Sequence, residues 1–149
     1  MIETSDLTGA PNLEKINLTG CRSLCEVHPS IGVLKRLQEI KNYIPGIKQL
    51  WKGSAVLHNL KELDLSYFEN MIETPDLTGA PNLEKINLTG CRNLCEVHSS
   101  IGVLERLKEL RMSGTRIKQL SMGMLVVLHN LRILDLNHSK NLIETPDLS

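Results

Sequence analysis

Two copies of a Cys-x-x-x-Cys-x-x-His pattern are the groups in this 149-residue sequence best suited to chemistry. The first copy is Cys21, Cys25 and His28, and the second is Cys91, Cys95 and His98. Thiolate and imidazole are common zinc ligands, so each copy is a candidate metal site. Against this, Cys21 and Cys91 fall where the apolar pattern turns toward a core, whereas Cys25 and Cys95 each follow a leucine and should point away from it. We therefore favour structural thiols and predict neither metal nor cofactor.

The histidines and serines offer no better case for catalysis. Four of the five histidines are paired copies of two repeated positions, and no serine or cysteine nucleophile stands out from the repeats. We expect a chain that is not an enzyme. Glycosylation sequons begin at Asn17, Asn87 and Asn137. The first residues lack the basic and apolar regions of a secretory leader, so we expect unused sequons, free thiols and a location in the cytoplasm, or in cytoplasm and nucleus.

Composition argues against two classes of partner. Seventeen basic and seventeen acidic residues give a net charge of zero, so no positive field favours nucleic acid. No apolar run approaches the ~20 residues that a membrane-spanning helix needs. Aromatic residues make up only 3% of the chain, so its core must be aliphatic.

An internal duplication organises the chain. Residues 1–40 align without a gap with residues 71–110 and differ from them at six of 40 positions. The match resumes with Leu-His-Asn-Leu at 57–60 and 128–131, and with Ile-Glu-Thr-Pro-Asp-Leu at 72–77 and 143–148. A unit of about 70 residues has therefore been repeated, and each unit is long enough for three shorter repeats.

The shorter repeat is clearest from Leu83, where apolar residues follow the order L-x-x-L-x-L-x-x-C. This spacing is typical of a leucine-rich repeat, in which a short strand sends alternate side chains to a shared core. We predict one α/β domain over 1–149, a leucine-rich-repeat solenoid shaped as an arc, with a parallel concave sheet and a mostly irregular convex side. Full coils are predicted at 13–36, 37–59, 60–82, 83–106 and 107–130, with partial coils at 1–12 and 131–149.

Two features depart from the repeat. Asn42 and Pro45 stand where other coils have an inward leucine and an inward cysteine, so coil 37–59 should be the least regular. Neither end shows a capping segment, and we expect exposed leucines there to favour self-association.

The strand positions that point away from the core are the candidate binding residues. Their chemistry differs from coil to coil, and they form a mixed-charge, hydrogen-bonding surface suited to a protein. The predicted protein-binding residues on the concave face are Asn17, Lys41, Tyr43, Asp64, Ser66, Asn87, Thr89, Arg111, Asp135 and Asn137. Tyr43 and Arg111 are the expected anchors, because Tyr and Arg are frequent among binding hot spots.

Several segments resemble one family. Trp51-Lys-Gly, Leu57-His-Asn-Leu-Lys-Glu-Leu-Asp-Leu, Ile72-Glu-Thr-Pro-Asp-Leu and Gly90-Cys-Arg-Asn-Leu are similar to the repeat region of plant intracellular TIR-NB-LRR disease-resistance proteins. The resemblance implies a recognition module of an innate-immune receptor that senses pathogen effectors or restrains the nucleotide-binding domain. It implies a protein partner: an effector, a guarded host protein or the receptor's own nucleotide-binding domain. The sequence has no Gly-x-x-x-x-Gly-Lys-Ser/Thr motif of its own. The alternative is an uncapped repeat fragment or designed repeat module with only a scaffold role.

Overall fold

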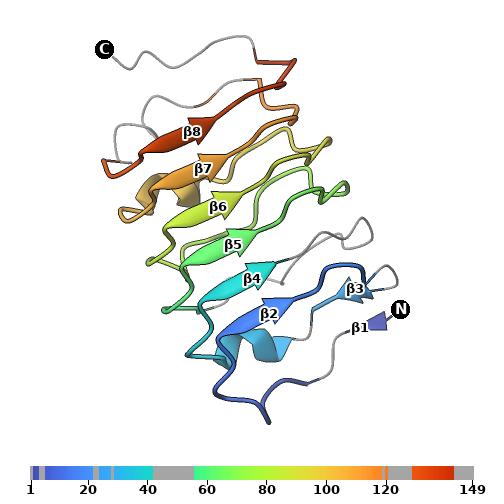
Figure 1. The fold of residues 1–149 in the computed structure, drawn as a ribbon, viewed down its shortest axis with the longest axis vertical. Coiled ribbons are helices and arrows are strands. Elements are labelled where there is room, and N and C mark those ends of the chain that lie inside the picture. Colours follow the sequence, from blue (N-terminus) through green and yellow to red (C-terminus); the bar gives the residue numbers. More distant parts are fainter. Residues whose placement is uncertain are drawn as a thin grey trace.

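The computed structural model describes residues 2–3, 6–21, 24–27, 29–41, 56–118, 120 and 129–142. Six short strands form one parallel sheet in chain order (Figure 1): β2 (Lys15–Asn17), β4 (Glu39–Lys41), β5 (Glu62–Asp64), β6 (Lys85–Asn87), β7 (Glu109–Arg111) and β8 (Ile133–Asp135). A separate parallel pair joins β1 (Ile2–Glu3) to β3 (Leu24–Glu26). The six strands begin 23 or 24 residues apart, and each begins two residues after the start of a predicted coil.

The middle residue of each strand builds the core. Ile40, Leu63, Ile86 and Leu110 are paired in register across four neighbouring strands, and all four are buried. Alternation along each strand sends these side chains inward and their polar neighbours outward. One coil cannot enclose its own apolar face, so the core exists only because consecutive coils stack.

After five of the six sheet strands, the described chain turns through one recurring backbone conformation. The third residue beyond the strand has a positive φ in five coils, at Gly20, Tyr67, Gly90, Gly114 and His138. Glycine adopts this left-handed conformation without strain, whereas tyrosine and histidine adopt it at a cost of about 1–2 kcal/mol. The Leu-Thr-Gly sequence that follows β2 and β6 therefore supplies a glycine where the turn needs a left-handed backbone.

Polar side chains join the coils along the turns that precede the strands. The amide groups of Asn59, Asn82 and Asn130 each donate to a backbone carbonyl of the preceding coil. The Asn130 bond, to the Glu105 oxygen, measures 2.9 Å. Each of these amides therefore satisfies a backbone carbonyl of a neighbouring coil.

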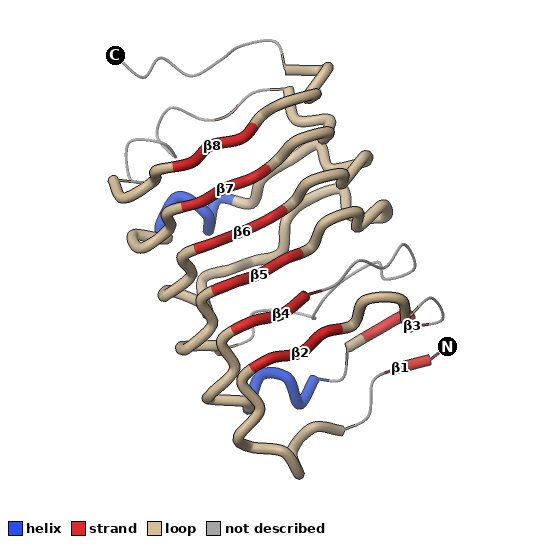
Figure 2. Tube along the Cα trace, viewed as in Figure 1, coloured by secondary structure: helices blue, strands red, loops and turns tan. Residues whose placement is uncertain are grey.

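The return segments are mostly irregular, as predicted. Two 3₁₀ helices, η1 (Pro29–Val33) and η2 (Ser99–Val103), lie behind the sheet (Figure 2). No α-helix is assigned among the described residues. Asn42 and Pro45 lie outside the described residues, so the predicted irregularity of coil 37–59 stays a prediction.

In the part of the chain that the structure describes, no helix combines the length and apolar character needed to cross a bilayer.

Candidate functional site

The outer face of the six-stranded sheet brings the main predicted binding residues into one line. Strand pairing places Asn17, Lys41, Asp64, Asn87, Arg111 and Asp135 side by side in adjacent strands. Neighbouring strands are about 4.8 Å apart, so this row extends for about 24 Å. We call it the outer row. Its members come from every strand of the sheet, and their chemistry changes from coil to coil.

Four members of the outer row also support the turn that follows their strand. The Oδ1 atoms of Asn17, Asp64, Asn87 and Asp135 each accept the backbone N–H two residues ahead at 3.0 Å. This is the Asx turn that Asn and Asp favour. One oxygen of each side chain is thus committed to local structure.

The two basic members of the outer row lie in ion pairs. Lys41 Nζ is 2.9 Å from Glu39 Oε1, and Arg111 Nε is 3.7 Å from Glu109 Oε2. Lys15 also reaches Glu39, at 3.4 Å. The hydrogen bond from Lys41 is the main reason that the pKa of Glu39 lies below its ordinary value. The basic charges of the outer row are therefore matched by neighbouring carboxylates.

The other predicted binding residues each follow a member of the outer row by two positions: Tyr43, Ser66, Thr89 and Asn137. Only some of the described ones are exposed. Thr89 and Asn137 reach the surface, but Ser66 is only 3% exposed. Its backbone N–H and its hydroxyl both bond the Asp64 carboxylate, which holds the side chain inside the turn. The prediction that Ser66 is open to a partner is therefore wrong. Tyr43 lies outside the described residues.

Tyr67 is a candidate that sequence reasoning missed. Its side chain is 55% exposed, and it occupies the left-handed turn position with a φ of 60°. The ring lies against Gly90, where a Cβ atom would be 2.4 Å from Tyr67 Cδ1. Residues in uncommon backbone conformations cluster at functional sites, and tyrosine is frequent among binding hot spots. The available signal was its alignment with Gly20 and Gly90, which marks a position where a bulky residue is unexpected.

The described cysteines and histidines do not gather into a set of metal ligands. Cys91 is buried and its thiol donates to the Leu65 carbonyl at 3.1 Å, as a residue at an inward turn should. Burial raises the pKa of Cys91 to about 11. Cys95 is exposed, as predicted, and His98 caps η2 by accepting the Ser100 N–H. Within the described ranges, no three His, Cys, Asp or Glu residues gather as metal ligands do.

The prediction that Cys21 lies at an inward turn like Cys91 is wrong. Its sequence context repeats that of Cys91, yet Cys21 is exposed. The reason is its place in the sheet, because β2 is the first strand in the order of the six described strands and pairs only with β4. Cys91 is covered by the preceding coil, which supplies the Leu65 carbonyl, and among the described strands none takes that place beside Cys21.

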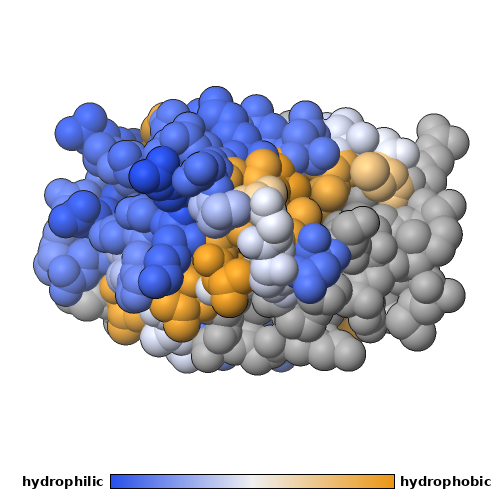
Figure 3. Space-filling view, turned by 90° about the horizontal axis from the view of Figure 1, so that it is seen from below, coloured by the Kyte–Doolittle hydropathy of each residue, from blue (hydrophilic) through white to orange (hydrophobic). Residues whose placement is uncertain are grey.

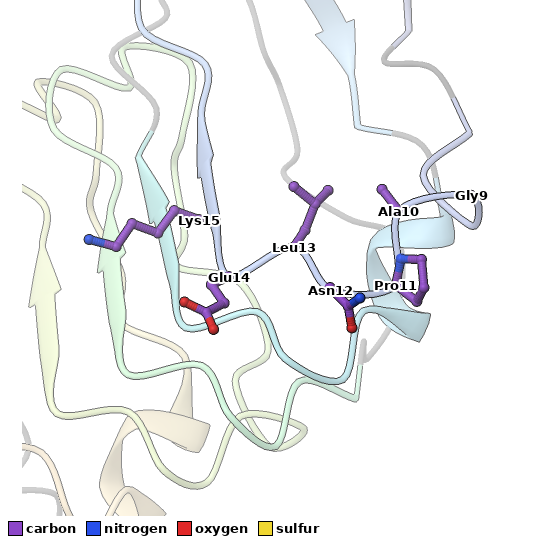
Figure 4. A pocket seen from close by; sticks show the side chains of 7 residues that line it. All are labelled: Gly9, Ala10, Pro11, Asn12, Leu13, Glu14 and Lys15. Carbon is purple, nitrogen blue, oxygen red and sulfur yellow. The ribbon is translucent and has the colours of Figure 1, made fainter.

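One open hollow lies near the same end of the sheet. It measures about 530 Å³ and is lined by the single run Gly9–Lys15 (Figure 4). Leu13 and Glu14 point in different directions there. Ligand pockets usually bring polar groups together from several elements, and this hollow does not.

The repeat spacing, the parallel register and the stacked core define a leucine-rich-repeat solenoid. Plant resistance proteins are similar to this chain. TMV resistance protein N of Nicotiana glutinosa is 33% identical over 123 residues, which cover 83% of this chain and 11% of that protein. Disease resistance protein RML1B of Arabidopsis thaliana is 40% identical over 80 residues, which cover 54% of this chain and 8% of that protein.

These similarities confirm the resemblance to plant disease-resistance proteins of the TIR-NB-LRR kind. The chain spans about a tenth or less of the length of these relatives. No family model matches it. A leucine-rich-repeat protein of Leptospira interrogans has a related solved structure, with 21% identity and a TM-score of 0.46, covering 93% of this chain and 49% of that one. The fold assignment rests on the register of this chain's own strands.

Proposed function

We propose that this chain is a protein-recognition module of a plant innate-immune receptor, and that its outer row is the binding surface. In this role it senses a pathogen effector or a guarded host protein, or it restrains the receptor's nucleotide-binding domain. It does so without catalysis, in the cytoplasm or in cytoplasm and nucleus. Similarity to resistance proteins supports the receptor context.

The observation that carries the proposal is the outer row itself. Six side chains of differing chemistry stand in register on a stacked core that holds their backbone fixed. A rigid support lowers the entropy lost on binding. Local ion pairs at Lys41 and Arg111 keep the net field small, which suits a polar protein surface better than nucleic acid.

Affinity capture with two matched double variants tests the proposal. The row variant is Lys41→Ala with Arg111→Ala, and the control is Lys35→Ala with Arg116→Ala. The control removes the same two residue types from exposed positions outside the sheet. A recombinant nucleotide-binding domain of a related receptor, and extracts of infected and healthy leaves, are presented to the wild-type chain and to both variants.

The proposal expects a protein that the wild type and the control retain and the row variant loses. Equal retention by all three proteins places binding elsewhere on the surface. If neither the purified domain nor any extract protein binds the wild type above a denatured-chain control, the scaffold role becomes the better reading. Circular dichroism of both variants establishes that they remain folded.

A further inference from the structure

The turns after the strands continue the hydrogen-bond ladder of the sheet. The backbone N–H groups of Tyr67, Gly90 and Gly114 each donate to a carbonyl of the next coil at 2.8 Å. These turn residues therefore keep the spacing of the strands, about 4.8 Å. The same turn position in the following coil is His138, which shares their left-handed backbone. We call Tyr67, Gly90, Gly114 and His138 the turn row.

Tyr67 brings an aromatic ring to a largely polar surface. Figure 3 looks onto the β2 end of the molecule, where hydrophilic residues gather on one side and apolar residues lie further in. Of the Phe, Tyr and Trp residues that the structure describes, Phe68 is buried and Tyr67 is 55% exposed. The Tyr67 ring occupies the place where a Cβ atom at Gly90 would lie, so the missing side chain makes room for the ring.

The position beside the Tyr67 ring is open. Apart from its own chain neighbours, a Cβ atom at Gly114 would meet only the Gly90 Cα and N among the described atoms within 4 Å, both at 3.7 Å. A flat group over Gly114 would lie one coil spacing, about 4.8 Å, from the ring over Gly90. Aromatic pairs in proteins have ring centroids ~4.5–7 Å apart. The turn row therefore has space for a second ring beside Tyr67.

Several polar groups near this space already have partners. The N–H groups of the turn row bond the next coil. The Oδ1 atoms of Asn87 and Asp135 accept the N–H groups of Thr89 and Asn137 at 3.0 Å. A sugar would bring several hydroxyl groups that need partners once water is displaced. A flat apolar ring needs none, so the turn row favours an aromatic side chain over a sugar.

We propose that the turn row is the subsite for an aromatic side chain of the protein that the outer row binds. The incoming ring stacks beside Tyr67 over Gly114, where a residue without a side chain allows close approach. Tyr67 is then the residue that sets the preference for an aromatic group. The inference rests on the proposed function, because that function supplies the protein partner.

Titration of the isotope-labelled chain with N-acetyl-phenylalanine amide, followed by NMR, tests the subsite without a natural partner. We expect a saturable shift of the Gly114 N–H, because a ring stacked there adds its ring current. N-acetyl-cyclohexylalanine amide is the matched control, because it has the same carbon skeleton and no aromatic ring. It should bind about 2- to 12-fold more weakly, the factor that a favourable aromatic pair contributes. Methyl β-glucoside should give no saturable shift.

Four variants locate the bound ring. Tyr67→Ala should abolish the saturable shift, and Tyr67→Phe should keep it, because phenylalanine retains the ring. Gly114→Ala should weaken binding, because its Cβ atom fills the open position. Gly20→Ala is the matched control for backbone strain: its φ is +83°, and its Cβ atom would meet nothing within 4 Å. It should bind the phenylalanine amide as the wild type does, and circular dichroism shows whether each variant is folded.

Adding Tyr67→Ala and Tyr67→Phe to the affinity capture separates this inference from the proposed function. A protein that the row variant loses should also be lost by Tyr67→Ala and retained by Tyr67→Phe. If Tyr67→Ala retains that protein fully, the subsite is wrong and the proposed function stands. If the wild type captures no protein, the proposed function fails, and the amide titration decides whether the turn row accepts an aromatic ring.

Four titration results would overturn the inference. The first is the absence of a saturable shift at Gly114. The second is equal or tighter binding of the cyclohexylalanine amide, which would show a general apolar contact. The third is undiminished binding by Tyr67→Ala. The fourth is a saturable shift with the glucoside and none with the phenylalanine amide, which would assign the turn row to a sugar.

Discussion

Replacing Gly90 with alanine tests the packing of the turns beside the outer row. Gly90 has a φ of +76°, where a side chain costs about 1–2 kcal/mol. Its new Cβ atom would also lie 2.4 Å from Tyr67 Cδ1 and 2.5 Å from Cε1, so the ring must leave its position. An off-rotamer shift costs about 0.5–1.5 kcal/mol. We expect Gly90→Ala to lower the free energy of unfolding by about 1.5–3.5 kcal/mol.

Alanine substitutions at Gly114 and Gly20 separate the cost of backbone strain from the cost of displacing the Tyr67 ring. Their φ values are +75° and +83°, so alanine imposes a similar backbone strain at each. A Cβ at Gly114 would lie 3.7 Å from the Gly90 Cα, an ordinary contact, and one at Gly20 would meet nothing within 4 Å. Gly114→Ala and Gly20→Ala should therefore cost only the strain, about 1–2 kcal/mol.

Urea unfolding followed by circular dichroism measures all three variants. Repeating Gly90→Ala and Gly114→Ala in a Tyr67→Ala background completes a double-mutant cycle. The extra cost at Gly90 should vanish in that background, because no ring remains to be displaced. Equal costs at Gly90 and Gly114 in the natural background, or an excess that survives Tyr67→Ala, would refute the reasoning.

Three further predictions follow from the described contacts. Cys95 should react with a thiol reagent at neutral pH while Cys91, whose pKa is raised to about 11 by burial, reacts only after unfolding or in strong alkali. Lys41→Ala should raise the pKa of Glu39 toward its ordinary value of 4.5, as an NMR titration would show, and cost at most about 1 kcal/mol. Ser100→Ala should cost about 1–3 kcal/mol in urea unfolding, because it removes the 2.9 Å acceptor of a buried N–H.

Each of these has a control. For Cys91, labelling in denaturant should reach completion, and rapid labelling of the folded protein at neutral pH would contradict the assigned burial. The folded pKa of Glu39 is lowered, so its ion pair stabilises the fold above pH 4.5 and the benefit is lost as pH falls through the folded pKa. If the free energy of unfolding of Lys41→Ala fell at acid pH as steeply as that of the wild type, the ion pair between Lys41 and Glu39 would be contradicted. Ser30→Ala removes the equivalent 2.8 Å bond to half-buried Leu7 and should cost less than Ser100→Ala.

The sequence was sufficient to predict the repeat and the strands. Period-two alternation and a 23- or 24-residue spacing are local properties, and they predict an inward apolar side chain in each strand. Ile40, Leu63, Ile86 and Leu110 are buried at that position. The outer row followed from the same alternation, because a residue on one side of a core position must face the opposite way. These predictions needed only the geometry of an extended chain.

The turns were harder to predict. Ser66 was expected at the surface and is buried, because the Asp64 side chain captures its hydroxyl within the turn. Tyr67 was overlooked because a left-handed backbone at a tyrosine is contrary to its local preference. Contacts with the neighbouring coil hold it there, including the bond from its N–H to the Thr89 carbonyl. Such a conformation can be recognised only when the coils are aligned in space.

Cys21 and Cys91 show most clearly what the sequence determines and what the tertiary structure determines. The same nine residues lead to both, so the sequence alone determines that each lies at a turn after a strand. Only the tertiary structure decides that Cys91 is buried and Cys21 exposed, because burial in a solenoid is supplied by the neighbouring coil. Local sequence sets which way a side chain points, and stacking sets what covers it.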